Sequence, residues 1–447
     1  MESSSTVRFV LPSFLFLASA AFAGAHIADF DSYWKKRAEE ANHEAKRSYN
    51  PDPVSLTRQF NNLVGEDLAK HRKQGRGLRG TNRIIGLCQA TNPIDRCWRC
   101  RRNWADRRKQ LAECAQGFGR HAGGGKAGEL YVVTDASDSD VVNPKPGTLR
   151  YGVVQDRPLW IVFARDMIIR LAEELIVASN KTIDGRGADV RIAGGAGVTL
   201  QFVQNVILHG IHLHDIKAGN GGMVRDSESH VGRRTRSDGD GISIIGSSNI
   251  WIDHVSVASC MDGLIDVGQS STAITISNCH LTQHSDAMPF GESDSYSGDA
   301  IAQITLAFNH FGTGLVQRMP RCRWGFCHIV NNDYTHWMMD AVGGSKHPTM
   351  LGQGNRYTAP ATHFAKEVYI DGKLSDKKCR GEQLMLSQAG EKRNHATELA
   401  NGASSVESGS PELKQEFPSK EHELIGNYVS RLTRFAGALD CVADQQC

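Results

Sequence analysis

The chain has 447 residues, 45 of them glycine, and this length exceeds what one compact domain with a single hydrophobic core usually reaches. An elongated repeat fold escapes that limit, because each layer packs only against its neighbours. The formal net charge of +2 gives no strong electrostatic indication of a partner, and no stretch reaches the roughly 18 apolar residues of a membrane-spanning helix.

Residues 1–23 have the pattern of a secretory signal peptide. Arg8 precedes an apolar run from Phe9 to Phe22, and Ala21-Phe22-Ala23 fits the small-x-small cleavage pattern. The run is short for a membrane span. We therefore expect a secreted, extracellular protein that leaves the membrane once the signal is removed.

Residues 24–85 form a polar, basic and helix-prone region, which Asn50-Pro51-Asp52-Pro53 divides in two. Residues 31–110 contain 19 Lys and Arg against 9 Asp and Glu. Such a segment suits a polyanion, whether nucleic acid, acidic lipid or acidic polysaccharide, or is a solvated basic face. We predict a small helical N-terminal region followed by a linker.

Eleven cysteines fit an oxidising compartment. Cys97 and Cys114 lie close together in the sequence, and Cys441 and Cys447 close the chain, so both pairs are candidate local disulfides, although sequence alone does not fix the connectivity. The odd total leaves at least one thiol unpaired or intermolecular. Asn180 begins the one N-glycosylation sequon.

One nine-residue frame recurs within residues 86–370, with apolar residues at its second, fourth and ninth positions. Its copies span 205–213, 249–257, 273–281, 303–311 and 326–334, with a weaker one at 349–357, and the successive offsets in sequence number are 44, 24, 30, 23 and 23. Repeats of 20–50 residues are typical of solenoids, and two short strands per unit favour a parallel β-helix with one coil per repeat. A β-sandwich would alternate similarly but would need no fixed frame. We predict an all-β solenoid over 86–370.

Asn309, Asn332 and Asn355 share the seventh position of the frame. Stacked coils would bring their amides into a ladder at the bend between two strands.

Beyond residue 370 the frame is lost, and Lys, Glu, Ser and Gly dominate as far as about residue 424. We expect residues 371–447 to form loops and a tail that pack on the outside of the β-helix.

Two acidic clusters are separated by the length of one repeat. Asp238-Gly239-Asp240 and Asp262-Gly263-Leu264-Ile265-Asp266 begin as far apart as the frame copies at 249 and 273, so adjacent coils would stack them on one face. A single Asp-Gly pair usually marks a turn. Four stacked carboxylates repel one another and favour a bound cation, and their oxygens suit Ca²⁺, although no EF-hand loop is present.

A basic cluster, Gln317-Arg318-Met319-Pro320-Arg321-Cys322-Arg323, lies just before the frame copy at 326. This position is two or three coils beyond the acidic clusters. Arginine is the preferred partner of carboxylates, so the pattern indicates an anionic substrate held between a calcium site and arginines. Ion pairs on a solenoid face are the alternative.

Several longer strings have the form of known family motifs. They are Cys88–Cys100, Thr182–Gly187, Trp251–His254, Ser271–Asn278, Gln317–Arg323 and Val330–Trp337. Through them the chain resembles the plant pectate lyases, almost continuously from residue 88 to about 369. The resemblance implies a right-handed parallel β-helix, and the basic helical segment before it resembles an N-terminal region that some plant members carry.

The resemblance implies a calcium-dependent lyase acting on polygalacturonate, and it implies roles for seven residues. The calcium ligands carry over onto Asp238, Asp240, Asp262 and Asp266, the catalytic arginine onto Arg318, and the substrate-binding arginines onto Arg323 and Arg321. The implied partner is an acidic polysaccharide and not a nucleic acid, and we expect a monomer in the cell wall.

The implied reaction is a β-elimination in α-1,4-linked galacturonate. It removes the C5 proton, next to the C6 carboxylate, and expels the O4 sugar. Calcium would neutralise the carboxylate and stabilise the developing enolate charge. Arginine normally keeps its proton, so for Arg318 an anion-stabilising role stays open beside the role of base.

The sequence departs from the family pattern at the string Gln283–Gly291, where Asp286 replaces a lysine that grips a substrate carboxylate. Arg233 replaces a tryptophan, and after Lys366 the family pattern is reduced to Gln383-Leu-Met-Leu386. These departures leave open a second hypothesis, a catalytically weakened or inactive β-helix that binds pectin. A polygalacturonase would need paired catalytic aspartates with Gly-His-Gly and Arg-Ile-Lys strings, which are absent.

Overall fold

The computed structural model describes residues 31–77, 88–361, 369–371, 383–386, 398–400 and 428–447. The predicted signal peptide at 1–23 lies outside these residues, and so do residues 24–30 and 78–85 of the predicted N-terminal region and linker. No helix in the described ranges is long and apolar enough to cross a membrane.

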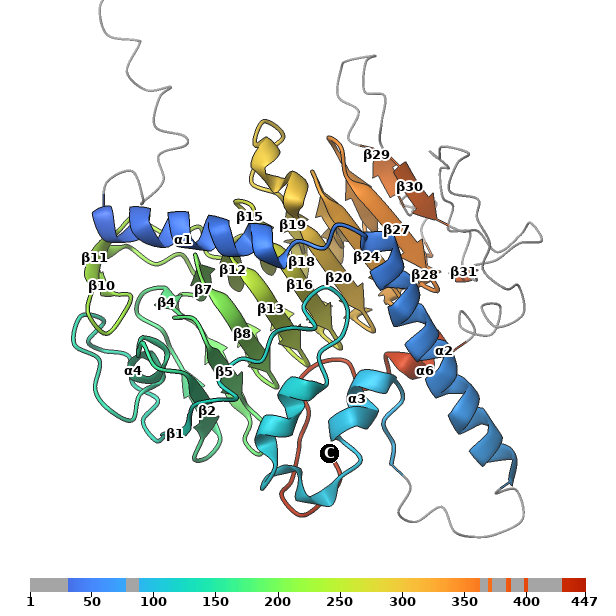
Figure 1. The fold of residues 1–447 in the computed structure, drawn as a ribbon, viewed down its shortest axis with the longest axis horizontal. Helices are drawn as coiled ribbons and strands as arrows, with labels where there is room; N and C mark the ends of the chain where they lie inside the picture. The colour runs from blue at the N-terminus through green and yellow to red at the C-terminus, as the bar shows by residue number, and fades with distance from the viewer. Residues whose placement is uncertain (1–30, 78–87, 362–368, 372–382, 387–397, 401–427) are drawn as a thin grey trace, which may run out of the picture.

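Three parallel sheets run the length of the molecule, and each coil of the chain contributes to them in turn (Figure 1). Sheet I consists of β4 Leu175–Ile176, β7 Val198–Gln201, β12 Ile242–Ile245, β15 Ile265–Gly268, β19 Pro289–Phe290, β23 Arg321–Cys322, β26 Val342–Gly344 and β29 Tyr369–Asp371. Sheet II consists of β1 Glu129–Val133, β2 Leu159–Phe163, β5 Lys181–Asp184, β8 Gln204–His209, β13 Ser248–Asp253, β16 Thr272–Ser277, β20 Gln303–Ala307, β24 Phe326–Val330, β27 Thr349–Gln353 and β30 Gln383–Leu386. Sheet III consists of β3 Met167–Ile169, β6 Val190–Ala193, β9 His212–His214, β14 Ser256–Ala258, β17 His280–Thr282, β21 His310–Phe311, β25 Asp333–Thr335, β28 Arg356–Thr358 and β31 Glu398–Ala400. The predicted parallel β-helix is confirmed.

The repeated frame of the sequence sets the register of sheet II. Its second positions pair across adjacent strands in the order Val206, Ile250, Ile274, Ile304, Cys327 and Met350. These side chains are buried and belong to one continuous core inside the coils. A one-residue slip would turn the whole apolar set outward, so the apolar positions fix the stacking.

The predicted asparagine ladder is present at the bend between sheets II and III. Asn309 Nδ2 donates to Asn332 Oδ1 at 2.9 Å, and Asn332 Nδ2 donates to Asn355 Oδ1 at 3.1 Å. All three side chains are buried. The ladder satisfies polar groups that would otherwise be costly inside the bend.

The β-helix continues past residue 370, where we expected it to end. β30 pairs with β27 and β31 pairs with β28, so two further strands extend sheets II and III. β30 is Gln383–Leu386, the family remnant noted in the sequence. Gly352 pairs with Ile329 on one side and with Leu386 on the other. The chain segment from Gly352 to Leu386 is thus longer than the preceding coil. Because of this extra length, the nine-residue frame does not recur at the expected offset in the sequence.

Two N-terminal helices lie across the strands on the outside of the β-helix (Figure 1). α1 (Ser32–Ser48) is capped by Asp31, whose side chain accepts from the Tyr33 amide at 2.9 Å, and α2 begins at Pro53 and ends at Gly77. The break falls where Pro51 and Pro53 predict it. On α2, Phe60 packs against Phe308 of the chain segment that follows β20.

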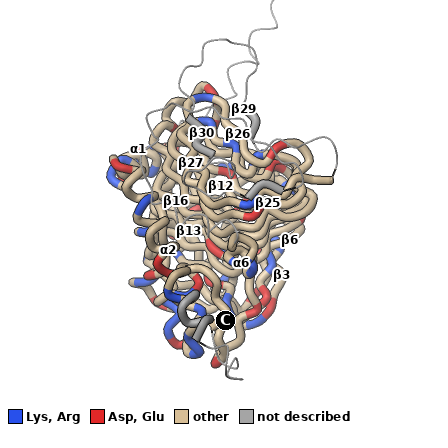
Figure 2. The backbone as a smooth tube through the Cα atoms, turned by 90° about the vertical axis from the view of Figure 1, so that its right-hand side faces the viewer, with Lys and Arg blue, Asp and Glu red and all other residues tan. Residues whose placement is uncertain are grey.

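Other short helices complete the fold. They are α3 Pro93–Trp98, α4 Leu149–Val153, α6 Val429–Leu432 and the 3₁₀ turns η2 Arg102–Trp104, η3 Arg108–Glu113 and η4 Ser297–Ile301. The segments around α3 and α6 cover the outer face of sheet II, where a second apolar cluster forms beneath them. Charged residues gather at the periphery of the coils (Figure 2).

Disulfides tie the covering segments and, at Cys322–Cys327, join two strands of the β-helix. The two predicted pairs, Cys97–Cys114 and Cys441–Cys447, are confirmed, and Cys88–Cys100 and Cys322–Cys327 also form. Two further cysteines in the described residues, Cys260 and Cys279, are free.

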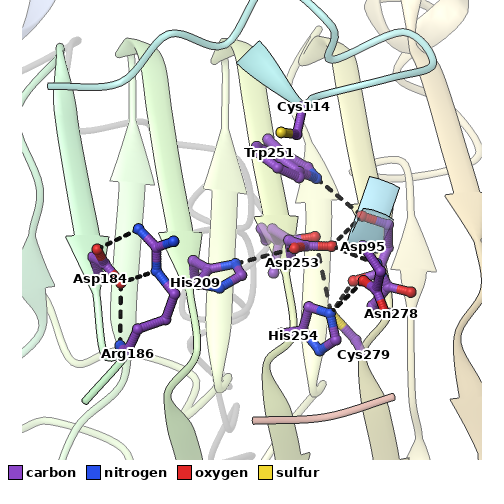
Figure 3. A network of polar contacts seen from close by, with 12 residues as sticks. Asp95, Cys114, Asp184, Arg186, His209, Trp251, Asp253, His254, Asn278 and Cys279 are labelled. Carbon is purple, nitrogen blue, oxygen red and sulfur yellow. Dashed lines mark hydrogen bonds and ion pairs between the residues drawn. The ribbon is translucent and has the colours of Figure 1, made fainter. Parts of the chain in front are cut away.

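A buried polar network joins both covering segments to sheet II (Figure 3). His254 approaches Asp95 Oδ1 with Nε2 and the Gly437 carbonyl with Nδ1, both at 2.8 Å. Beside it, His209 lies 3.0 Å from Asp253. Both ring nitrogens of His254 face acceptors, so the imidazolium form satisfies them. His254 therefore has a structural role.

Candidate active site

The acidic residues lie at the start of two adjacent strands of sheet I. Asp238 and Asp240 precede β12, while Asp262 precedes β15 and Asp266 lies on it. β12 and β15 are paired in parallel, with Ser243 opposite Asp266. The Asp262 amide donates to the Gly239 carbonyl at 3.2 Å. The one-coil offset seen in the sequence therefore brings the two clusters together.

Burial and mutual repulsion dominate the electrostatics of this acidic cluster. Burial, with smaller contributions from Asp262 and Asp238, raises the pKa of Asp240 to about 7. Burial also raises the pKa of Asp266 well above its usual value, reinforced by Asp240 and Asp262. The pKa of Asp238 is raised by burial, then by Asp262. Each carboxylate thus opposes ionisation of another.

The cluster has the donor chemistry for a hard cation. Asp240 Oδ1 and Asp266 Oδ1 are buried and have no hydrogen-bond partner in the part of the chain that the structure describes. Buried carboxylate oxygens without a partner are costly unless a cation or proton satisfies them. Across the described ranges, no three Asp, Glu, His or Cys side chains converge into a complete metal-binding set. The carboxylate oxygens of these aspartates are the kind of ligand that calcium prefers. The side chains would have to move before they could all contact one ion.

Gly263 shows that the cluster is more than a pair of turns. A Cβ atom at Gly263 would fall 1.7 Å from Asp266 Oδ1, so any side chain there would displace this carboxylate. Glycine at position 263 thus allows the backbone to approach the Asp266 carboxylate closely.

The basic cluster lies between β22 (Leu315–Gln317) and β23. β22 pairs with β18 (His284–Asp286) in a small parallel sheet, with Gln317 opposite Asp286. Arg318 has a φ of 62°, in the left-handed region that side chains rarely adopt. Its Nε lies 3.0 Å from Asp286 Oδ1, and Gln317 Nε2 donates to the same oxygen at 2.9 Å.

The other two arginines lie on sheet I itself: Arg321 is on β23, and Arg323 directly follows this strand. In the order of that sheet, β23 lies two strands from β15 and three from β12. Burial lowers the pKa of Arg323, helped by the charges of Arg321 and Arg318. Arg318 and Arg323 in turn oppose the raised pKa of Asp266. The arginines and the acidic cluster thus lie within one electrostatic field.

Asp340 is a site residue that the sequence reasoning missed. It is buried, and burial raises its pKa to about 6, although the Arg318 backbone and the Arg321 charge oppose the shift. Asp340 follows Arg318 by the same sequence offset that separates the paired residues Arg321 and Gly343. The length of this coil, counted on from Arg318, would therefore have predicted the position of Asp340 in the sequence.

The two departures from the family pattern have different surroundings. Asp286 contacts Arg318, whereas the family pattern predicts a contact between this position and the substrate. Arg233 is exposed on β11 (Val231–Arg234), which forms a hairpin with β10 (Gly222–Arg225).

Comparisons with known proteins give one consistent result. Residues 169–403 match the pectate lyase family, and residues 26–84 match the family of pectate lyase N-terminal regions. A pectate lyase of Lilium longiflorum is 57% identical over 444 residues, 98% of this chain and 99% of the relative. Probable pectate lyase P59 of Solanum lycopersicum is 52% identical, covering 95% and 94%. The crystal structure of the major allergen from cedar pollen aligns with a TM-score of 0.70 at 42% identity, covering 78% of this chain and 99% of the allergen.

Proposed function

Because this chain belongs to the pectate lyase family, we propose that it is a calcium-dependent lyase that cuts de-esterified pectin in the plant cell wall by β-elimination. The observation that carries the proposal is the acidic cluster on two adjacent coils, with the charges of Arg318 and Arg323 acting on Asp266. An anionic polymer would lie across sheet I between the two groups.

Calcium would be held by Asp238, Asp240, Asp262 and Asp266. Bound there, it would neutralise a substrate carboxylate and stabilise negative charge that develops beside it. The unpartnered oxygens of Asp240 and Asp266 support this assignment.

Arg321 and Arg323 are proposed to bind substrate carboxylates. Arg321 Nε is buried and has no hydrogen-bond partner among the described residues, so a carboxylate oxygen would satisfy it. Arg323 donates to the Gly291 carbonyl, which orients its guanidinium. Two positioned guanidinium groups would fix consecutive galacturonate units and exclude an uncharged polymer.

Arg318 is proposed to act on the C5 proton. As base, the neutral guanidine would accept that proton; as a cation, Arg318 would stabilise the negative charge left at C5 and C6 while water accepts the proton. Its Nε lies 3.0 Å from Asp286 Oδ1, so the Arg318 guanidinium is already paired with a carboxylate, an arrangement that suits the cationic role. The elimination is complete when the O4 sugar leaves with its bonding electrons and takes up a proton.

The pattern of residues 1–23 supports secretion, and we propose a monomer whose one macromolecular partner is polygalacturonate.

Incubation of the secreted protein with polygalacturonate tests the proposal. Elimination leaves a 4,5-unsaturated sugar that absorbs in the ultraviolet, and hydrolysis does not. We expect absorbance that disappears with a chelator, returns with calcium, and is lost in Asp262→Ala. Asp215→Ala, at an exposed aspartate paired with His214, is the matched control. Full activity in chelator would refute calcium dependence.

A second candidate is a β-helix that binds pectate without cutting it, and the ion pair between Arg318 and Asp286 favours it. This protein would retain polygalacturonate on an affinity gel and yield no ultraviolet-absorbing product at any calcium concentration.

A further inference from the structure

The first turn of α1 contacts the hairpin of β10 and β11. Trp34 is completely buried, and its Nε1 donates to Asp226 Oδ2 at 3.0 Å. Asp226, in the hairpin turn, is itself completely buried. Tyr33 stacks on His230 of the same turn, with ring centroids 4.0 Å apart. An N-terminal helix and a loop 192 residues away thus form one packed unit.

The other side of the Trp34 ring faces Arg234, at the end of β11. The Arg234 guanidinium carbon lies 5.4 Å from the ring centroid, and Arg37 lies over the same ring at 4.7 Å. Arg234 Nη1 donates to Gln201 Oε1 at 2.6 Å, and Nη2 lies 3.2 Å from Glu174 Oε2. The Arg234 and Glu174 side chains are only 9% and 14% exposed, so the packing of Trp34 holds this ion pair in a nearly dry setting.

Glu174 connects this ion pair to the acidic cluster. Thr199 Oγ1 donates to Glu174 Oε1 at 2.8 Å. Thr199 is paired with Ser243, whose hydroxyl donates to Asp240 Oδ2 at 2.6 Å. Glu174 is therefore a further carboxylate linked to the proposed metal ligands through Thr199 of β7, and it lies two strands of sheet I before β12.

We propose that Trp34 is a positioning residue that holds Arg234 against Glu174 and so cancels a negative charge at the edge of the substrate site. This inference rests on the proposed function, because the charge matters most to a polyanion that binds there. The proposal gives the N-terminal region a role, because α1 keeps the Glu174 charge next to the acidic cluster neutralised.

The proposal predicts opposite changes in two affinities. An uncompensated Glu174 would repel galacturonate carboxylates and attract calcium. A variant that merely loosens the fold would weaken both kinds of binding. Calcium affinity and substrate KM measured on the same protein therefore distinguish the two explanations.

Three variants test the proposal. Arg234→Gln should raise KM for polygalacturonate roughly three- to tenfold and lower the calcium Kd by a similar factor, as expected for one partly screened charge. Trp34→Ala should shift both quantities in the same directions, and kcat should change little. Glu174→Gln, introduced into the Trp34→Ala protein, should restore KM, because Gln keeps an oxygen for Thr199.

The control is Arg47→Ala, at an α1 residue with 66% side-chain exposure, which should change neither quantity. Calcium Kd is measured by isothermal titration calorimetry without substrate, and thermal unfolding shows whether each variant is folded. Parallel weakening of calcium and substrate binding, or no rescue by Glu174→Gln, would overturn the proposal. If the unaltered protein makes no unsaturated product, the proposed function fails, and the calcium titration alone still decides whether Trp34 acts through Glu174.

Discussion

Removing the Asp286 charge should make the enzyme faster. Asp286→Asn deletes the negative charge that holds Arg318 at 3.0 Å and keeps an oxygen for Gln317 Nε2. Coulomb's law at 3.0 Å gives about 5.5 kcal/mol at a dielectric constant of ~20 and about 1.4 kcal/mol at that of water. The two side chains are 27% and 29% exposed, so the water-like value applies, reduced by salt to about 1 kcal/mol.

An interaction of that size corresponds to roughly a fivefold to tenfold change in rate. We therefore expect kcat/KM on polygalacturonate, followed by ultraviolet absorbance, to rise by about this factor in Asp286→Asn. Asp294→Asn is the matched control, because Asp294 lies 3.7 Å from Arg323 with a side chain that is 50% exposed. It should change kcat/KM less than about twofold.

The charge-reversed variant separates two explanations for this effect. Asp286→Lys should raise activity at low calcium and lower the calcium needed for half-maximal rate, if residue 286 also acts on the substrate carboxylate. An unchanged or slower Asp286→Asn protein, with its fold intact, would refute the reasoning that Asp286 restrains Arg318. In that case the ion pair positions Arg318 for turnover.

Three further outcomes follow from the same geometry. Arg318→Lys should lose most turnover in the same assay, because a point charge cannot reproduce the planar guanidinium; near-normal turnover would rule out its assignment. Burial raises the pKa of Asp240 to about 7, so calcium binding should release a proton and strengthen as pH rises through about 7, which calorimetry in two buffers of different ionisation enthalpy detects. Although burial lowers it, Asp95 and Asp253 raise the pKa of His254 above the ordinary 6.5. The stability that His254 contributes should therefore be complete below pH 6.5 and be lost as pH rises through the folded pKa. His254→Gln should cost about 3–5 kcal/mol at low pH in denaturant unfolding, and an equal loss at every pH would contradict this.

The sequence predicts the β-helix and its register because the same apolar positions recur in every coil. Ile250, Ile274 and Ile304 stack as their frame positions require. The proximity of the two acidic clusters follows from the same rule, since an offset of one repeat places residues side by side in any solenoid. Periodicity therefore predicts both the core and the approximate place of the site.

Contacts between side chains from separate elements leave no periodic signal. Nothing local to Asp286 indicates that it contacts Arg318, because that contact depends on how the small sheet of β18 and β22 sits beside sheet I. The link between Trp34 and Arg234 is hidden for the same reason. The strand at Gln383–Leu386 was missed because its excursion from β27 is longer than the repeat. These features depend on loop geometry, which varies from coil to coil.

The link from Asp95 through His254 to Gly437 affects how this protein is made. A solenoid can fold coil by coil as it leaves the ribosome or crosses a membrane, because each layer needs only the one before it. Here a middle coil, at β13, is completed by a residue near the very end of the chain. Until Gly437 arrives, a buried histidine lacks one of its two acceptors. Folding in chain order therefore ends with a separate closing step, and chains truncated before α6 should be less stable than the full chain although nearly all their coils are complete.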